Sequence, residues 1–313
     1  MEPILNVLFP VFAIIAAGYV SGRFRLLGPD SSDALNRFVY WVSLPVFLFE
    51  AMASVDLPVM FNAAFLNAYI GGILLVWALA LVLGRVFFGR GLAEGAMLGM
   101  NSVYGNTGYM GIPLAITAYG EAAALPAILA TVVNTAVVVG IAAALIEIGQ
   151  NDDRRGRAIA ADIGLGLLKN PLFMAPVLGC LWSMTGLGLA APVTAFSDIL
   201  GAAAGPCALF SIGLFLVGRP MSEGLAEVGV MTAMKLLLQP VLTAALILYL
   251  FPMEALWAKV AVLMAALPTG SGSFVLAQAC GLYVARTSSV ILISTVLSVI
   301  TMAVFFAVYP PAG

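Results

Sequence analysis

The sequence predicts an all-α polytopic membrane protein with ten transmembrane helices, arranged as two inverted five-helix repeats. Of its 313 residues, 63% are hydrophobic and 9% are charged, which is more apolar sequence than a soluble core can bury. The apolar runs are long and continuous, whereas a membrane β-barrel strand alternates over about ten residues. Two runs carry glycine and proline clusters near their middles, at 105–113 and 267–273. These clusters predict two helices that break inside the membrane.

Five apolar runs fill the first half of the chain, each at least as long as the roughly 20 residues that cross the hydrocarbon core. The fourth contains the first glycine and proline cluster. The fifth ends just before Asn151, where the longest polar connection of the chain begins. The predicted spans are 3–22, 32–54, 62–88, 93–119 and 122–149.

Five more runs fill the second half. The seventh ends before Arg219, the ninth contains the second glycine and proline cluster, and the tenth follows Arg286. The predicted spans are 170–188, 192–217, 228–251, 255–281 and 287–309.

Eleven of the thirteen basic residues fall at odd-numbered connections between these spans, so they share one side of the membrane. Basic residues in short loops accumulate on the cytoplasmic side. We therefore expect a multi-pass protein of the plasma or inner membrane with both termini outside the cytoplasm. The eleven residues are Arg23, Arg25, Arg37, Arg85, Arg90, Arg154, Arg155, Arg157, Lys169, Arg219 and Arg286.

The midpoint of the chain suggests a joint between two related halves, 1–150 and 170–313, linked by a cytoplasmic segment at 151–169. Five spans per half is an odd number, so the second half must enter the membrane from the opposite face, which predicts an inverted repeat. Chance matches are the alternative, because glycine and proline are common in membrane helices. A shift of 161 residues aligns Pro10 with Pro171, Gly18 with Gly179, Pro45 with Pro206, Leu48-Phe49 with Leu209-Phe210, Gly111 with Gly272, and Gly120 with Gly281.

The two broken spans predict a binding site for an anion where they cross. If each span unwinds, the downstream half-helices begin near Pro113 and Ser273, inside the membrane. Their N-termini carry free N–H groups and partial positive charge, which attract anions. The alternative is that small residues only allow close helix packing. The predicted substrate-binding residues are Asn106, Thr107, Gly108, Gly111, Pro113, Pro268, Thr269, Gly270, Ser271 and Ser273.

The stretch 106–114, with 267–270 and 274–277 in the second half, resembles the auxin efflux carrier family, which includes plant PIN carriers and bacterial dicarboxylate permeases. The resemblance extends over the chain, including 42–45 and 235–240. It implies a bile acid symporter-like fold with a scaffold domain and a transport domain, an elevator movement, and a homodimer. It also implies that Asn106 contacts the substrate carboxylate and that Thr269 is its polar counterpart. The expected function is secondary transport, in the export direction, of small organic anions such as carboxylates or auxin-like acids.

Three ionisable residues inside spans are candidates for coupling or for a charge role, namely Asp198, Lys235 and Lys259. For the two lysines the alternative is snorkelling to the nearer surface. The chain has no histidine, and Cys180, Cys207 and Cys280 are isolated, so we expect no metal, no cofactor and no enzymatic activity. The basic run 154–157 fits a topology signal better than a nucleic-acid patch, so we expect no nucleic-acid partner. Two other functions remain open: a sodium-coupled organic anion symporter, and a non-transporting receptor or a channel on the same fold.

Overall fold

The computed structural model describes residues 2–54, 62–150, 164–218 and 224–311, and these ranges are helical apart from turns and short connections. Most of the predicted cytoplasmic linker, residues 151–163, lies outside them. No strand forms in the described ranges beyond one antiparallel bridge between Gly105 and Thr269. The described helices that are long and apolar enough to cross a membrane, judged by length and composition, are Leu5–Arg23, Ala63–Phe88, Glu121–Gln150, Ala191–Leu216, Leu225–Tyr249 and Val284–Val308.

The remaining predicted spans are built from shorter helices, so the count of ten stays a prediction. The first half contains α1 (Glu2–Arg23), α2 (Pro29–Phe38), η1 (Val39–Ser43), α3 (Leu44–Ala53), α5 (Ala63–Phe88), α6 (Leu92–Val103), η2 (Thr107–Gly111), α7 (Ile112–Tyr119), η3 (Glu121–Ala123), α8 (Ala124–Val133), η4 (Asn134–Val138) and α9 (Val139–Gln150). The second half contains α11 (Pro171–Ser183), α12 (Ala191–Ala202), α13 (Ala204–Leu216), α14 (Leu225–Ala233), η5 (Met234–Leu238), α15 (Gln239–Tyr249), α16 (Ala255–Ala266), α17 (Gly272–Cys280) and α18 (Val284–Val308).

Three prolines inside the helical segments widen the helix instead of breaking it. Pro45, Pro113 and Pro240 each occupy the second position of an α-helix that directly follows a π-helical turn, η1, η2 and η5 respectively. Proline has no N–H to donate to the carbonyl four residues earlier, so one helical hydrogen bond is missing at each site. A local π-turn absorbs this missing bond while the chain remains helical.

The first helix of each half of the chain packs against a helix of the other half, and the two contacts are reciprocal. α1 packs on α13 and α11 packs on α3. Gly18 lies so close to Phe210 that a Cβ at this glycine would overlap the Phe210 backbone, and Gly179 lies equally close to the backbone of Phe49. A shift of 161 residues converts the first of these contacts into the second. A contact pattern of this kind is typical of two-fold symmetry.

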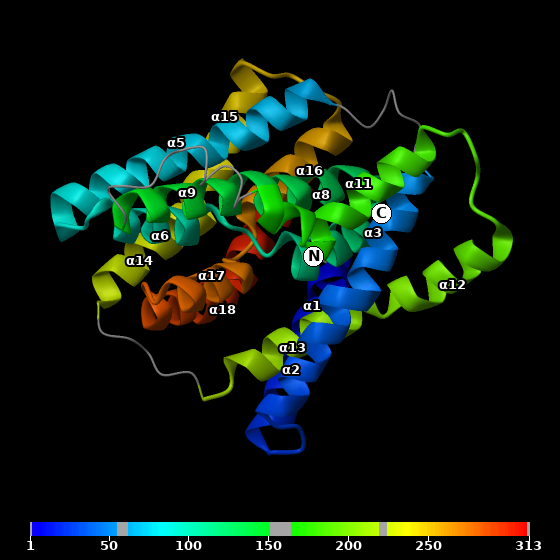
Figure 1. The fold of residues 1–313 in the computed structure, drawn as a ribbon, viewed down its shortest axis with the longest axis horizontal. Helices are drawn as coiled ribbons and strands as arrows, with labels where there is room; N and C mark the ends of the chain where they lie inside the picture. Colours follow the sequence, from blue (N-terminus) through cyan, green and yellow to red (C-terminus); the bar gives the residue numbers. More distant parts are fainter. Residues whose placement is uncertain (1, 55–61, 151–163, 219–223, 312–313) are drawn as a thin grey trace.

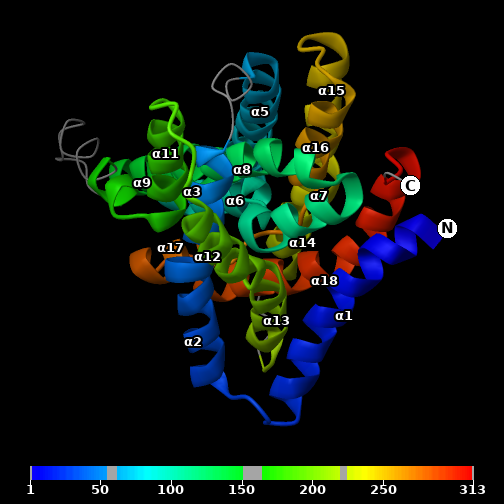
Figure 2. The same ribbon diagram turned by 90° about the vertical axis from the view of Figure 1, so that its right-hand side faces the viewer.

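The helices form two groups. α1, α2, α3, α11, α12 and α13 make one group, and Figure 2 shows α1, α2 and α13 extending away from α5, α15 and α16. In the other group α5 packs on α6 and α15, and α14 packs on α18 (Figure 1). Its centre is fully buried: every residue in 95–103 and in 260–270 is shielded from solvent. These two stretches lead directly into the two predicted breaks.

Candidate functional site

The two predicted breaks are present, and each one satisfies the other's backbone. α6 ends at Val103 and α16 ends at Ala266, with extended residues following both. The N–H of Asn106 donates to the carbonyl of Pro268 over 2.8 Å, and the N–H of Gly270 donates to the carbonyl of Tyr104 over 2.9 Å. Unpaired backbone groups cost several kcal/mol each in hydrocarbon. The two unwound segments are therefore stable here because they pair as a short antiparallel bridge.

The first break lies earlier in the sequence than expected. The α-helix α7 begins at Ile112, next to Pro113 as expected, but helical structure already resumes at Thr107, in the π-helical turn η2. The pairing of residues 104–106 with the second segment fixes the position of the break, whereas Pro113 lies inside the resumed helix. In the second span α17 begins at Gly272, as the expected start near Ser273 requires.

Side chains from two other helices hold the unwound segments in place. The Nδ2 of Asn134, in η4, donates to the carbonyl of Gly105 and to the hydroxyl of Thr107, both over 3.2 Å. In the second half the N–H of Thr269 donates to the Oγ of Ser294, in α18, over 3.1 Å. Sequence reasoning missed Asn134 and Ser294, because a lone polar residue in an apolar span gives no sign of the helix it contacts.

We call the place where the two unwound segments pair, around residues 104–106 and 268–270, the crossover. It presents backbone N–H donors that have no backbone acceptor among the described residues. At the start of η2 these are the N–H groups of Thr107, Gly108 and Tyr109, since the first helical bonds to Asn106 come from Met110 and Gly111. At the start of α17 they are the N–H groups of Ser271 and Gly272. Two helix N-termini, each with positive partial charge, thus meet on either side of one bridge. This arrangement suits a carboxylate or another anion.

Close backbone approach explains part of the glycine content at the crossover. A Cβ at Gly270 would lie 3.0 Å from the carbonyl oxygen of Gly105, and a Cβ at Gly272 would lie 2.5 Å from the hydroxyl of Tyr104. A Cβ at Gly111 would lie 2.6 Å from the side chain of Leu267. Tight packing and unpaired backbone donors therefore occur together at the crossover, and Gly272 belongs to both.

The predicted binding side chains do not all point into one open site. Asn106 is 8% exposed, and within the described residues its side chain makes no hydrogen bond, so its amide is available to a ligand. The Thr269 side chain is buried, and its hydroxyl donates to the carbonyl of Asn101 over 2.9 Å. Ser273 is buried and donates to the carbonyl of Gly270. Among the predicted residues, Gly108, Pro113 and Ser271 are half-buried.

The three ionisable candidates lie in different places. Lys235 is fully buried, and its ammonium donates to the carbonyl of Ala265 over 2.6 Å. The snorkelling alternative is therefore wrong for Lys235. Lys259 lies over the ring of Tyr119, with its Nζ 5.4 Å from the ring centre, and Asp198 is exposed on α12. Only Lys235 reaches the crossover.

Sequence reasoning also missed a cluster around Glu227 at the start of α14. Its carboxylate accepts hydrogen bonds from Arg90 and from the hydroxyl of Tyr283, and it lies 3.3 Å from the Nε of Arg286. The hydrogen bond to Glu227 raises the pKa of the Arg90 guanidinium. This cluster ties together the connection before α6, the start of α14 and the connection before α18. It therefore places Arg90 and Arg286, which were both predicted to be cytoplasmic, at the same end of the protein.

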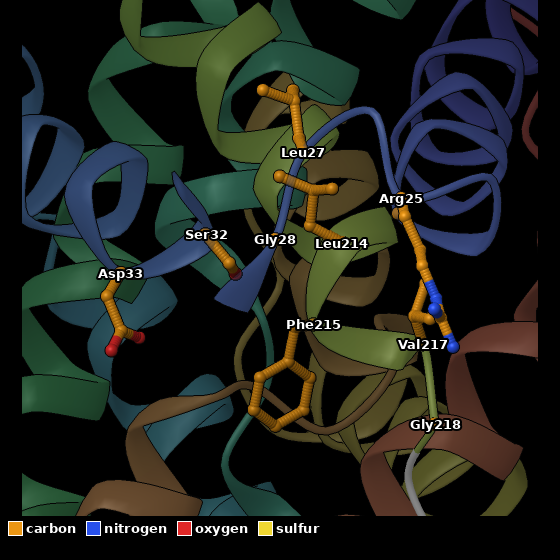
Figure 3. Close-up of a pocket in the computed structure, with 10 residues that line it drawn as sticks. Arg25, Leu27, Gly28, Ser32, Asp33, Leu214, Phe215, Val217 and Gly218 are labelled. Carbon is orange, nitrogen blue, oxygen red and sulfur yellow. The ribbon is translucent and has the colours of Figure 1, made fainter. Parts of the chain in front are cut away.

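A cavity of 620 Å³ lies outside the crossover, between the α1–α2 connection and the end of α13 (Figure 3). Figure 3 shows Arg25 and Asp33 on opposite sides of this cavity, with Phe215 between them. The ring of Phe215 also packs edge-on against Phe274 of α17, with 5.4 Å between ring centres. None of the predicted substrate-binding residues lines this cavity.

Comparison with known proteins identifies the family. The family described as "Membrane transport protein" matches residues 3–306. The chain belongs to this family. A Rhizobium meliloti (strain 1021) protein described as "Putative malonate transporter" is 31% identical over 302 residues, covering 96% of this chain and 94% of the relative. "Auxin efflux carrier component 8" of Arabidopsis thaliana is 26% identical over 335 residues, covering 90% of each chain.

A third relative, "Uncharacterized transporter YfdV" of Escherichia coli (strain K12), is 24% identical over 308 residues and covers 95% of this chain. The predicted membership of the auxin efflux carrier family is confirmed. This chain is a membrane transporter and not an enzyme.

Proposed function

We propose that this transporter carries small organic anions, including short dicarboxylates, and binds them at the crossover. The observation that carries the proposal is the pair of half-helix N-termini, whose free N–H groups begin at Thr107 and Ser271 on either side of the Gly105–Thr269 bridge. These donors, with the amide of Asn106, fit a carboxylate. The names of two relatives, "Putative malonate transporter" and "Auxin efflux carrier component 8", support a carboxylate substrate.

In this proposal the side chain of Asn106 is the primary polar ligand and Thr269 is a supporting residue. The Thr269 hydroxyl already bonds to Asn101, so this residue contributes by holding the second unwound segment. Gly108, Gly111, Gly270, Pro113 and Pro268 shape the backbone.

The proposed transport cycle uses the two groups of helices. We propose that α1, α2, α3, α11, α12 and α13 form a scaffold, and that the group containing the crossover moves against it as an elevator. The close packing of α1 on α13 and of α11 on α3 suits a fixed element, and their reciprocal contacts support two inverted repeats in 1–150 and 170–313. We further propose a homodimer in the plasma or inner membrane that exports its substrate, with both termini outside the cytoplasm.

Binding to Asn106 variants tests the site. Purified protein is screened by thermal shift against malonate, malate, succinate and indole-3-acetate, and the anion with the largest shift is then measured by calorimetry and by uptake into proteoliposomes. Losing one hydrogen bond to a charged group costs about 1.5–3 kcal/mol, so Asn106→Ala should weaken binding roughly 10- to 150-fold.

Asn106→Asp should bind more weakly still, because it adds a negative charge at nearly constant size. The matched control is Asn67→Asp, which adds the same charge at an exposed position of α5. Parent-like affinity in Asn106→Asp excludes the crossover as the anion site. Saturable uptake with counterflow indicates a carrier, large unitary currents indicate a channel, and binding without flux indicates a receptor.

A further inference from the structure

Lys235 is the one cationic side chain in the core of the crossover among the described residues. It lies in η5, is 0% exposed, and donates from its ammonium to the carbonyl oxygen of Ala265. Its Nζ is also 3.5 Å from the point that a Cβ on Gly105 would occupy, so it lies against the first unwound segment as well. Within the described ranges no carboxylate pairs with it.

The acceptor of this lysine belongs to the carbonyl end of a half-helix. The last four carbonyls of a helix have no partner within the helix, and they carry negative partial charge. Ala265 is the penultimate residue of α16, and the carbonyl of Met264 lies close to Gly105 as well. In secondary transporters with broken helices, such carbonyl ends coordinate the coupling cation. Here an ammonium of the chain itself occupies that position.

Charged groups on the helices around η5 are engaged elsewhere. On α14, Glu227 binds Arg90, Tyr283 and Arg286. On α6, Glu94 pairs with Arg90 over 3.4 Å. On α16, Lys259 lies over Tyr119 at the other end of the helix.

We propose that the Lys235 ammonium is a built-in cation for the crossover, and that it replaces a bound alkali ion in holding the carbonyl end of α16 against the first unwound segment. Lys235 is a positioning residue in this role, because it acts through the backbone that carries the anion-binding donors. The inference rests on the proposed crossover site and deepens it: anion transport by this protein requires no sodium. A sodium-coupled symporter, in contrast, needs those carbonyl oxygens free for its ion.

A substrate-free measurement tests the built-in cation first. Thermal unfolding of the parent, Lys235→Ala and Lys235→Met is compared in sodium, ethylammonium and choline chloride at equal ionic strength. The parent should unfold at the same temperature in all three salts. Lys235→Ala leaves room for a small cation, so ethylammonium should raise its unfolding temperature relative to choline, whereas Lys235→Met fills the space and should show no such rise. The control is Lys259→Ala, which removes a half-buried lysine that lies over Tyr119, away from the crossover, and it should not respond to ethylammonium.

Uptake into proteoliposomes provides the functional readout, with malonate as the probe. Parent uptake should be equal in sodium and in choline media. A cation near a partly buried helix C-terminus contributes up to about 2 kcal/mol, so uptake by Lys235→Met should fall about 30-fold, and ethylammonium should partly restore uptake by Lys235→Ala.

The inference is overturned if sodium specifically raises the unfolding temperature of the parent or its uptake rate. It is also overturned if Lys235→Met takes up malonate at the rate of the parent. If neither neutral variant folds but Lys235→Arg does, a positive charge at this position is required. If Lys235→Arg also fails to fold, the response of the parent to sodium tests the inference. If the parent carries none of the screened anions, the proposed substrate fails, and the unfolding series still tests the built-in cation separately.

Discussion

Asn134→Ala should weaken both the fold and the crossover site, because Asn134 holds the first unwound segment. Its side chain is 1% exposed and donates two hydrogen bonds, to the carbonyl of Gly105 and to the hydroxyl of Thr107. A buried hydrogen bond contributes about 1 kcal/mol net, and an acceptor left unpaired costs about 1–3 kcal/mol. Two lost bonds therefore predict a loss of about 2–3 kcal/mol, or roughly 30- to 150-fold in an equilibrium between ordered and disordered crossover.

The assay for Asn134→Ala combines thermal unfolding in detergent with calorimetric titration of the anion selected by the thermal-shift screen. The matched control is Thr131→Val in the preceding helical turns, where the buried hydroxyl bonds only to the carbonyl of Ala127 in its own helix. We expect Asn134→Ala to lower both the unfolding temperature and the anion affinity, and Thr131→Val to leave the affinity unchanged. Equal behaviour of the two variants would refute the idea that Asn134 positions the anion-binding donors.

Gly272→Ala should reduce both anion binding and stability, because its methyl group would lie 2.5 Å from the hydroxyl and 2.8 Å from the ring of Tyr104 at the crossover; calorimetry beside thermal unfolding checks this, and parent-like values in both contradict a tight contact. Pro113→Ala should slow uptake while the protein stays folded, since a restored N–H favours an α-helical turn in place of η2; unchanged turnover contradicts a role for this turn. Glu227→Gln should lower the unfolding temperature, because it leaves Arg90 and Arg286 without their shared carboxylate, and an unchanged temperature excludes a stabilising cluster. A single cysteine introduced at 151–160 in a cysteine-free variant should react with impermeant reagents only from the cytoplasmic side, and labelling from outside would reverse the proposed orientation.

The sequence by itself determined that this protein lies in a membrane and where two of its helices are interrupted. Composition requires a membrane environment, since so much apolar sequence cannot be buried in one soluble core. Glycine and proline at 105–113 and 267–273 predicted both breaks, because their effects on the backbone are local. The same locality left the π-turn before Pro113 unpredicted: a proline gives the position of a missing hydrogen bond, but not whether a break or a π-helical turn accommodates it.

The tertiary structure decided which residues meet at the crossover. Asn134 reaches Gly105, Thr269 turns toward Asn101, and Lys235 reaches Ala265, over separations of 29, 168 and 30 residues. Each contact depends on how one helix is rotated and shifted against another. A span that is apolar on every face has no polar stripe in its sequence, so the sequence pattern does not predict that rotation. Packing selects the rotation, because buried polar groups must find partners in a medium that offers none.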